Sequence, residues 1–147
     1  MTVPSRIIEL PDKNKVDIVK LGALDPENLA PTYRTLGSEV AYYGSLRDDL
    51  AHRRSQLSDK LENLQARLLI EKKVALKDIN NGKGPTVDEL KAHVRNTAEF
   101  QATSAQLMDS EYRFNQLGTV MKALSAKQEC LVSAAADRRQ EHRSTSS

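Results

Sequence analysis

The sequence predicts an all-α protein, a long antiparallel helical hairpin with coiled-coil seams. Apolar residues recur every seven positions over more than four repeats of its first half. A glycine-rich segment followed by a helix-capping pattern interrupts the chain near its middle. Aromatic residues make up only 4% of the 147 residues, which suits narrow seams better than a large globular core. Because leucine seams need partners, we expect such hairpins to assemble into a homo-oligomeric bundle or ring.

The first 24 residues show no sustained helical period, and we expect an N-terminal arm that is extended or partly disordered. Two short apolar clusters, residues 6–10 and 16–19, are separated by a polar segment. Two short strands, an arm that docks on a partner subunit, and a partly disordered leader are all compatible with this pattern. Asp25-Pro26-Glu27-Asn28 then predicts a helix start with proline at the first helical position. Pro31 predicts that this first helix is short or kinked.

A long helix is predicted from Leu36 to Ile79, about 65 Å at 1.5 Å per residue. Its seam consists of the residues that recur every seven positions: Leu36, Tyr43, Leu50, Leu57 and Leu64. A second series, four residues further along, is interrupted by Arg47 and Arg54. We expect these two arginines and Arg53 to form ion pairs with Asp48, Asp49 and Asp59.

A short turn at residues 80–86 is predicted to reverse the chain. Gly82 and Gly84 can adopt positive φ, Pro85 prevents the helix from continuing, and Thr86 with Glu89 forms a capping box. Short connections favour antiparallel neighbours. The hairpin domain therefore spans residues 25–140, followed by a flexible tail at 141–147.

The return arm is predicted to run from Thr86 to about Arg139 in two halves. The second half continues the oligomer seam with residues seven apart: Leu117, Leu124 and Leu131. The first half shows a shallower apolar series: Leu90, Val94, Ala98, Ala105, Met108 and Tyr112. The step of five from Tyr112 to Leu117 breaks the register between the halves. This slip predicts a kink, a local unwinding or a change of partner surface.

Catalytic and metal-binding patterns are not found in the sequence. The histidines, His52, His93 and His142, lie at no metal-ligand spacing and are expected on exposed helix faces. Cys130 is expected to be a small apolar residue of the return arm, and a single cysteine favours a reducing compartment. We expect no enzyme, no cofactor and no metal. No apolar run is long enough for a membrane span, and the N-terminus lacks a signal peptide, so we expect a cytoplasmic protein.

Basic residues cluster around the predicted turn, although the net charge of the chain is only +2. Lysines at i, i+4 end the first arm, one lysine lies in the turn, and a second i, i+4 pair begins the return arm. An antiparallel hairpin would bring the two rows together as a phosphate-binding tip. The expected DNA-binding residues are Lys72, Lys73, Lys77, Lys83, Lys91 and Arg95. The alternative is that these side chains complement a helix C-terminus and remain solvated.

The segment Glu71-Lys72-Lys73-Val74-Ala75-Leu76-Lys77, followed by Gly82-Lys83-Gly84, resembles the central segment of UvsY-type recombination mediators of T-even phages. The similarity extends loosely over residues 24–140. It implies a homo-oligomeric helical protein that binds single-stranded DNA and helps load a RecA-like recombinase onto strands coated by single-strand-binding protein. The chain departs from the family pattern at Ile79, where the family has an arginine, and Asp78 precedes it.

We expect DNA binding to be electrostatic and independent of base sequence. The aromatic residues are all expected in seams, leaving none for base stacking: Tyr33, Tyr42, Tyr43, Phe100, Tyr112 and Phe114. Two other functions are compatible with the same features. One is a coiled-coil scaffold or assembly chaperone with no nucleic-acid role, and the other is a regulator that binds another helical protein.

Overall fold

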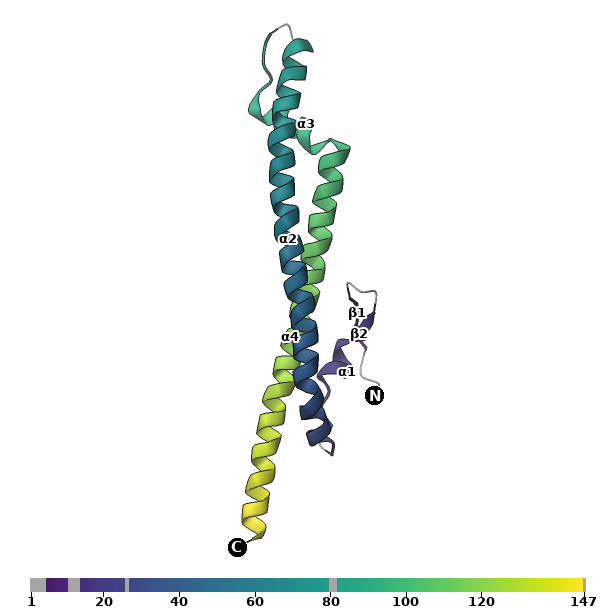
Figure 1. Ribbon diagram of the computed structural model, residues 1–147, viewed down its shortest axis with the longest axis vertical. Helices are drawn as coiled ribbons and strands as arrows, with labels where there is room; N and C mark the ends of the chain where they lie inside the picture. Colours follow the sequence, from purple (N-terminus) through teal and green to yellow (C-terminus); the bar gives the residue numbers. More distant parts are fainter. Residues whose placement is uncertain (1–4, 11–13, 26, 80–81, 147) are drawn as a thin grey trace. The chain divides into compact units, whose positions relative to one another are not determined.

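The structure is a computed structural model that describes residues 5–10, 14–25, 27–79 and 82–146. Its elements are β1 (Ile7–Glu9), β2 (Lys15–Asp17), α1 (Ile18–Gly22), α2 (Leu29–Ile79), α3 (Val87–Arg95) and α4 (Ala98–Thr145). The predicted all-α hairpin is confirmed, because the two long helices α2 and α4 pack against each other (Figure 1). The chain divides into two compact units. Unit 1 comprises Met1–Asp49 and Arg113–Ser147, and unit 2 comprises Leu50–Tyr112.

The described residues of the N-terminal arm belong to unit 1 and form β1, β2 and α1. β1 and β2 pair antiparallel, with Ile8 opposite Val16. Asp17 then caps α1, because its carboxylate accepts the backbone N–H of Val19 at 3.0 Å. Apolar side chains of the ribbon and of α1 are buried: Ile8, Leu10 and Ile18. The expectation of two short strands is thus confirmed, whereas the polar separator at residues 11–13 lies outside the described residues.

Helix α2 starts at Leu29, after the expected helix start at Pro26 and before the long helix expected from Leu36, and it tolerates its proline. Asp25 forms a turn before the helix, accepting the backbone N–H of Glu27 at 3.0 Å and the side-chain amide of Asn28 at 2.6 Å. The helix starts at Leu29, so Pro31 lies in its first turn, where an N–H has no partner within the helix. The predicted short or kinked first helix is therefore wrong. Pro26, the expected first helical residue, lies outside the described residues.

The heptad seam exists, and the chain fills it by itself. All eight expected seam residues are buried: Leu36, Tyr43, Leu50, Leu57, Leu64, Leu117, Leu124 and Leu131. Their burial within one chain removes the argument that exposed heptad leucines require a second copy. Any assembly must use other surfaces.

The register of α4 is continuous, contrary to the predicted slip. Thr103 and Ser110 are 4% and 3% exposed, and they extend the seven-residue series of Leu117 toward the N-terminus. By contrast, Met108 is 67% and Tyr112 63% exposed. The predicted seam followed apolar residues, but small hydroxyl side chains occupy the buried face here. The helix is unbroken from Ala98 to Thr145, so it also continues into the predicted tail.

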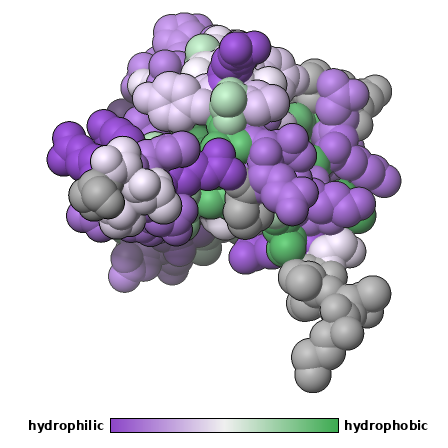
Figure 2. All heavy atoms as spheres, turned by 90° about the horizontal axis from the view of Figure 1, so that it is seen from below, coloured by the Kyte–Doolittle hydropathy of each residue, from purple (hydrophilic) through white to green (hydrophobic). Residues whose placement is uncertain are grey.

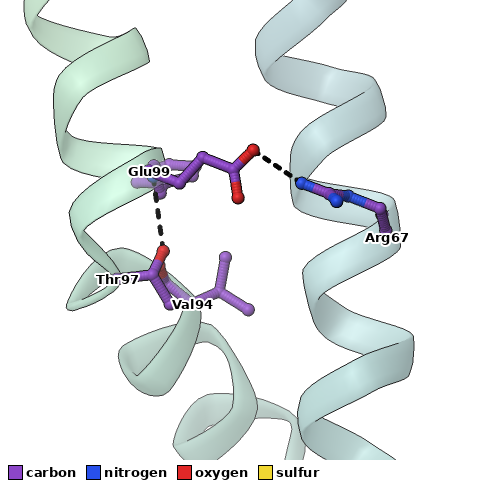
Figure 3. A network of polar contacts seen from close by, with 5 residues as sticks. Arg67, Val94, Thr97 and Glu99 are labelled. Carbon is purple, nitrogen blue, oxygen red and sulfur yellow. Dashed lines mark hydrogen bonds and ion pairs between the residues drawn. The ribbon is translucent and has the colours of Figure 1, made fainter.

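The return arm instead breaks between α3 and α4. Asn96 caps the C-terminus of α3, and the Thr97 hydroxyl accepts the backbone N–H of Phe100 at 3.4 Å to start α4. The same hydroxyl donates to the Val94 carbonyl at 2.7 Å. Beside this junction, Glu99 of α4 and Arg67 of α2 form an ion pair at 2.7 Å (Figure 3). An Asn-Thr pair followed by an acidic residue was the available signal for this cap.

On the face shown in Figure 2, which is seen from below relative to Figure 1, the surface is mostly hydrophilic, with hydrophobic residues in small areas between polar ones. His52, His93 and His142 are exposed, as predicted. Cys130 lies on α4, the return arm, and is exposed as well. Within the described residues, no helix combines the length and apolar character needed to cross a bilayer.

Candidate nucleic-acid interface

The end of unit 2 is built from the last turns of α2, the loop at residues 82–86 and α3. Gly82 has φ of +85°, and its N–H donates to the Lys77 carbonyl at 3.0 Å, which closes the helix end. The capping box is present as predicted: the Thr86 hydroxyl accepts from the Glu89 N–H at 3.3 Å, and the Glu89 carboxylate accepts from the Thr86 N–H at 3.1 Å. Asn80 and Asn81 of the predicted turn lie outside the described residues.

Helix α3 crosses α2 rather than running back along it, and α4 provides the antiparallel arm (Figure 1). The crossing is fixed by an apolar cluster in which Val94 packs with Leu64 and Leu68. α2 therefore continues beyond the level of this contact. Because each residue adds about 1.5 Å, Lys73 and Lys77 lie roughly 7 and 13 Å past Leu68 along the axis.

All six expected DNA-binding residues belong to unit 2. Lys72 is half-buried, and the other five residues are exposed: Lys73, Lys77, Lys83, Lys91 and Arg95. The structure gathers them at one end of the unit, but not as two facing rows. Lys91 and Arg95 flank Leu90 and Val94, the buried residues of α3, whereas the lysines of α2 extend past the crossing. We call these six residues the basic tip.

The charges of the basic tip are uncompensated within the part of the chain that the structure describes. None of the six side chains forms an ion pair or hydrogen bond with another described residue. From residue 72 to residue 95 the acids are Asp78, Asp88 and Glu89, and Glu89 is engaged in the capping box. Lys77 and Arg95 lie in the last turns of their helices. Basic residues are also expected there under the alternative that they only complement the negative end of the helix macrodipole.

Exposed apolar side chains lie among the basic ones, a feature that sequence reasoning missed. Ile70 is 67%, Val74 58%, Ile79 73% and Val87 65% exposed. Ile70 and Val74 are at i, i+4 and lie roughly 140° and 100° around α2 from the seam formed by Leu64 and Leu68, at about 100° per residue. The signal was available, because both residues fall outside the seven-residue series.

The aromatic residues differ from the prediction. Only Tyr43 is buried, whereas Tyr33 is 63%, Tyr42 43% and Tyr112 63% exposed. Phe100 and Phe114 are half-buried. Exposed tyrosines can stack on bases. None of the six aromatic residues lies between Lys72 and Arg95, so the basic tip itself contains no aromatic side chain for base stacking.

Arg47 and Arg53 do not form the predicted ion pairs. Arg47 forms no ion pair with any described residue, and its guanidinium lies 4.6 Å from the ring centre of Phe114. Arg53 is exposed and likewise unpaired among the described residues. The expected pairing of these two arginines with neighbouring aspartates is therefore wrong.

Comparisons with protein-family models, curated proteins and solved structures find no match for this chain. In the described residues, no group of three or more histidine, cysteine, aspartate or glutamate side chains is arranged to hold a metal ion. The chemistry offered by unit 2 is thus a set of exposed, unpaired ammonium and guanidinium groups. Such groups bind phosphate.

Proposed function

We propose that the protein is a recombination mediator that binds single-stranded DNA through the basic tip and helps load a RecA-like recombinase onto strands coated by single-strand-binding protein. The observation that carries this proposal is the uncompensated basic tip. Five of its six side chains are exposed, and none is paired with another described residue. The resemblance of residues 71–84 to UvsY-type mediators supplies the biological role.

Binding works by counterion release at each phosphate contact. A single strand loses affinity with salt at a logarithmic slope of about −0.7 per contact, so a tip with three to six contacts gives a slope of roughly −2 to −4. One tip covers few phosphates. Several copies on one strand would raise the affinity through effective concentration. We therefore include self-association in the proposal, through Ile70, Val74 and their neighbours rather than through the heptad leucines.

The test is a salt titration of binding to a fluorescent oligothymidylate, measured by anisotropy. The variant Lys73→Ala/Lys77→Ala is expected to weaken binding at low salt and to flatten the salt slope by about 0.7 for each lost contact. Its matched control is Arg53→Ala/Lys60→Ala, which removes the same charge from exposed positions of the same helix in the same unit. Equal affinities for both variants, or no binding by the native chain at low salt, would overturn the proposal.

A scaffold without a nucleic-acid role is the second candidate, and the exposed Ile70 and Val74 favour it. Light scattering of the native chain and of Ile70→Gln/Val74→Gln tests it. A scaffold is supported by an oligomer that this variant dissociates, in a chain that binds no oligothymidylate. If the native chain is a monomer at every concentration tested, both the scaffold and the assembly part of the mediator proposal are wrong.

A further inference from the structure

A polar groove lies on unit 1, between α2 and the middle of α4. Its volume is about 520 Å³, within the range of small-ligand sites. Arg47 comes from α2, and its other lining residues come from α4, including Phe114, Asn115, Gly118, Lys122 and Ser125. Two of the lining residues are cationic and no carboxylate lines the groove. All of these residues belong to unit 1, so the groove is distinct from the basic tip of unit 2.

Arg47 is the central feature of the groove. Its side chain is half-buried, and its Nε is buried without a hydrogen-bond partner. No described residue forms an ion pair with it. The central carbon of the guanidinium lies over the Phe114 ring, 4.6 Å from the ring centre. A partly desolvated cation without a counter-charge is unfavourable, and an aromatic ring offsets only part of that cost.

The arginine lies against α4 at two positions one helical turn apart, Phe114 and Gly118. A Cβ placed at position 118 would be 3.8 Å from Nη2 of Arg47 and 4.0 Å from its Nε, which are ordinary van der Waals distances. The guanidinium is thus in contact with the Phe114 ring and lies beside Gly118. Contact with the ring restricts the planar fork before a ligand arrives, which reduces the ordering needed on binding.

We propose that this groove binds a phosphate group, with Arg47 as its main ligand. Lys122 supplies a second positive charge at the exposed rim. Neutral donors are available as well, because neither the Ser125 hydroxyl nor the Asn115 side-chain amide is hydrogen-bonded to a described residue. The Thr119 hydroxyl is already engaged with the Asn115 carbonyl at 3.3 Å. Two cations, two neutral donors and no acid match the charge and oxygen count of a phosphate.

The phosphate can come from two sources, a nucleic-acid strand or a free phosphate compound. Both present the same phosphate oxygens to Arg47. The site does not rest on DNA binding by the basic tip, because the two share no residue. The experiment therefore uses both ligands on the full chain: sodium pyrophosphate in one arm and oligothymidylate in the other.

The measurement is a titration of the isotope-labelled chain followed in proton–nitrogen correlation spectra. We expect the Arg47 Nε–H and the backbone amides of residues 115–125 to shift with at least one ligand. Arg47→Met keeps an apolar stem on Phe114 but removes the charge, and it should lower the affinity at these signals about tenfold or more. Lys122→Gln, at an exposed position, should lower it less. Arg143→Gln, an exposed change elsewhere on α4, is the matched control and should have no effect.

The outcomes distinguish the two phosphate sources, and they distinguish binding at this groove from binding at the basic tip. Shifts with pyrophosphate alone identify a free phosphate ligand, and shifts with the oligonucleotide identify a strand. If neither ligand shifts these signals, or if Arg143→Gln weakens the response as much as Lys122→Gln, the groove is not a phosphate site. Loss of oligonucleotide binding in Lys73→Ala/Lys77→Ala with the pyrophosphate response intact would confirm that the two sites are separate.

Discussion

Helices α2 and α4 run through both units, but the side chains that are buried along them differ between the units. In unit 1 the seam of α4 is apolar and almost fully buried, with Leu117 1%, Val120 0%, Leu124 0% and Leu131 2% exposed. In unit 2 the same helix face carries Thr103 and Ser110. There the additional apolar residues come from α3, whose Leu90 is 8% and Val94 1% exposed. A continuous seven-residue series therefore does not mean uniform packing.

The two units obtain their stability from different contacts. A fully buried leucine contributes about 1.5–3 kcal/mol, whereas a small hydroxyl side chain buries little apolar area. Unit 1 therefore depends on the pairing of α2 with α4. Unit 2 depends on the short helix that crosses α2 at the cluster of Leu64, Leu68 and Val94. The basic tip is carried by the unit with the more polar seam, in which local opening is expected to require less free energy.

The largest effect is expected from Leu124→Ala in unit 1. The side chain is 0% exposed, so its truncation leaves a cavity and should lower the free energy of unfolding by about 2–5 kcal/mol. Ser110→Ala, on the same face of α4 in unit 2, should change it by less than about 1 kcal/mol. Urea denaturation followed by circular dichroism measures both. If the two variants lose a similar free energy of unfolding, the seams of the two units do not differ in their contribution to stability.

The buried lysine of unit 1 provides the second test. Lys127 is 8% exposed, donates to the Leu21 carbonyl at 2.8 Å and lies 3.9 Å from a carboxylate oxygen of Glu39. Lys127→Met leaves that carbonyl and the carboxylate without their cation, and should cost about 1–3 kcal/mol. Hydrogen exchange should become faster in residues 14–22, which pack through this contact.

Lys122→Met is the matched control, because Lys122 is an exposed lysine of the same helix. A second comparison uses Glu39→Gln with Lys127→Met. Removing both charges should recover part of the lost stability, since no carboxylate then remains unpaired near the seam. If the double variant is no more stable than Lys127→Met, the ion pair is irrelevant and the bond to Leu21 alone accounts for the effect.

In unit 2 the corresponding change is Val94→Ala. Two buried methyl groups are lost from the cluster that holds α3 on α2, at a cost of about 2 kcal/mol. Hydrogen exchange should accelerate in residues 87–95 and leave residues 117–131 unchanged. Val87→Ala is the control in the same helix, because Val87 is 65% exposed. Equal acceleration in both units would show that they open together.

The sequence predicted the fold through features that depend on local chemistry. The seven-residue series located the buried face of α2, and the Thr86 capping box located the start of α3. The buried face of α4 in unit 2 was missed, because Thr103 and Ser110 are not apolar and Met108 and Tyr112 are. Burial there follows from the helix period rather than from hydrophobicity. The break at Thr97 was missed for another reason, since its cap lies inside a pattern that continues as helix on both sides.

The candidate sites were predictable to different degrees. Exposure of the tip lysines follows from their place outside the seam, so Lys73 and Lys77 could be named in advance. The crossing angle of α3 depends on the tertiary contact of Val94 and could not. The groove around Arg47 was also inaccessible, because residues more than sixty positions apart form it and the arginine was expected to pair with its neighbours in the chain.

The smallest expected effect concerns the capping box, the local feature that sequence and structure describe identically. Thr86→Ala removes the acceptor of the Glu89 N–H and should lower the free energy of unfolding by about 1 kcal/mol, whereas Thr86→Ser retains the hydroxyl and should lower it by much less. Because the cap belongs to α3 and α3 carries Val94, the loss should appear as faster exchange in residues 87–95 and nowhere in unit 1. If Thr86→Ala also weakens DNA binding while Thr86→Ser does not, the position of Lys91 and Arg95 depends on the start of α3. Binding unchanged in both variants would assign the phosphate contacts to the lysines of α2 and the loop.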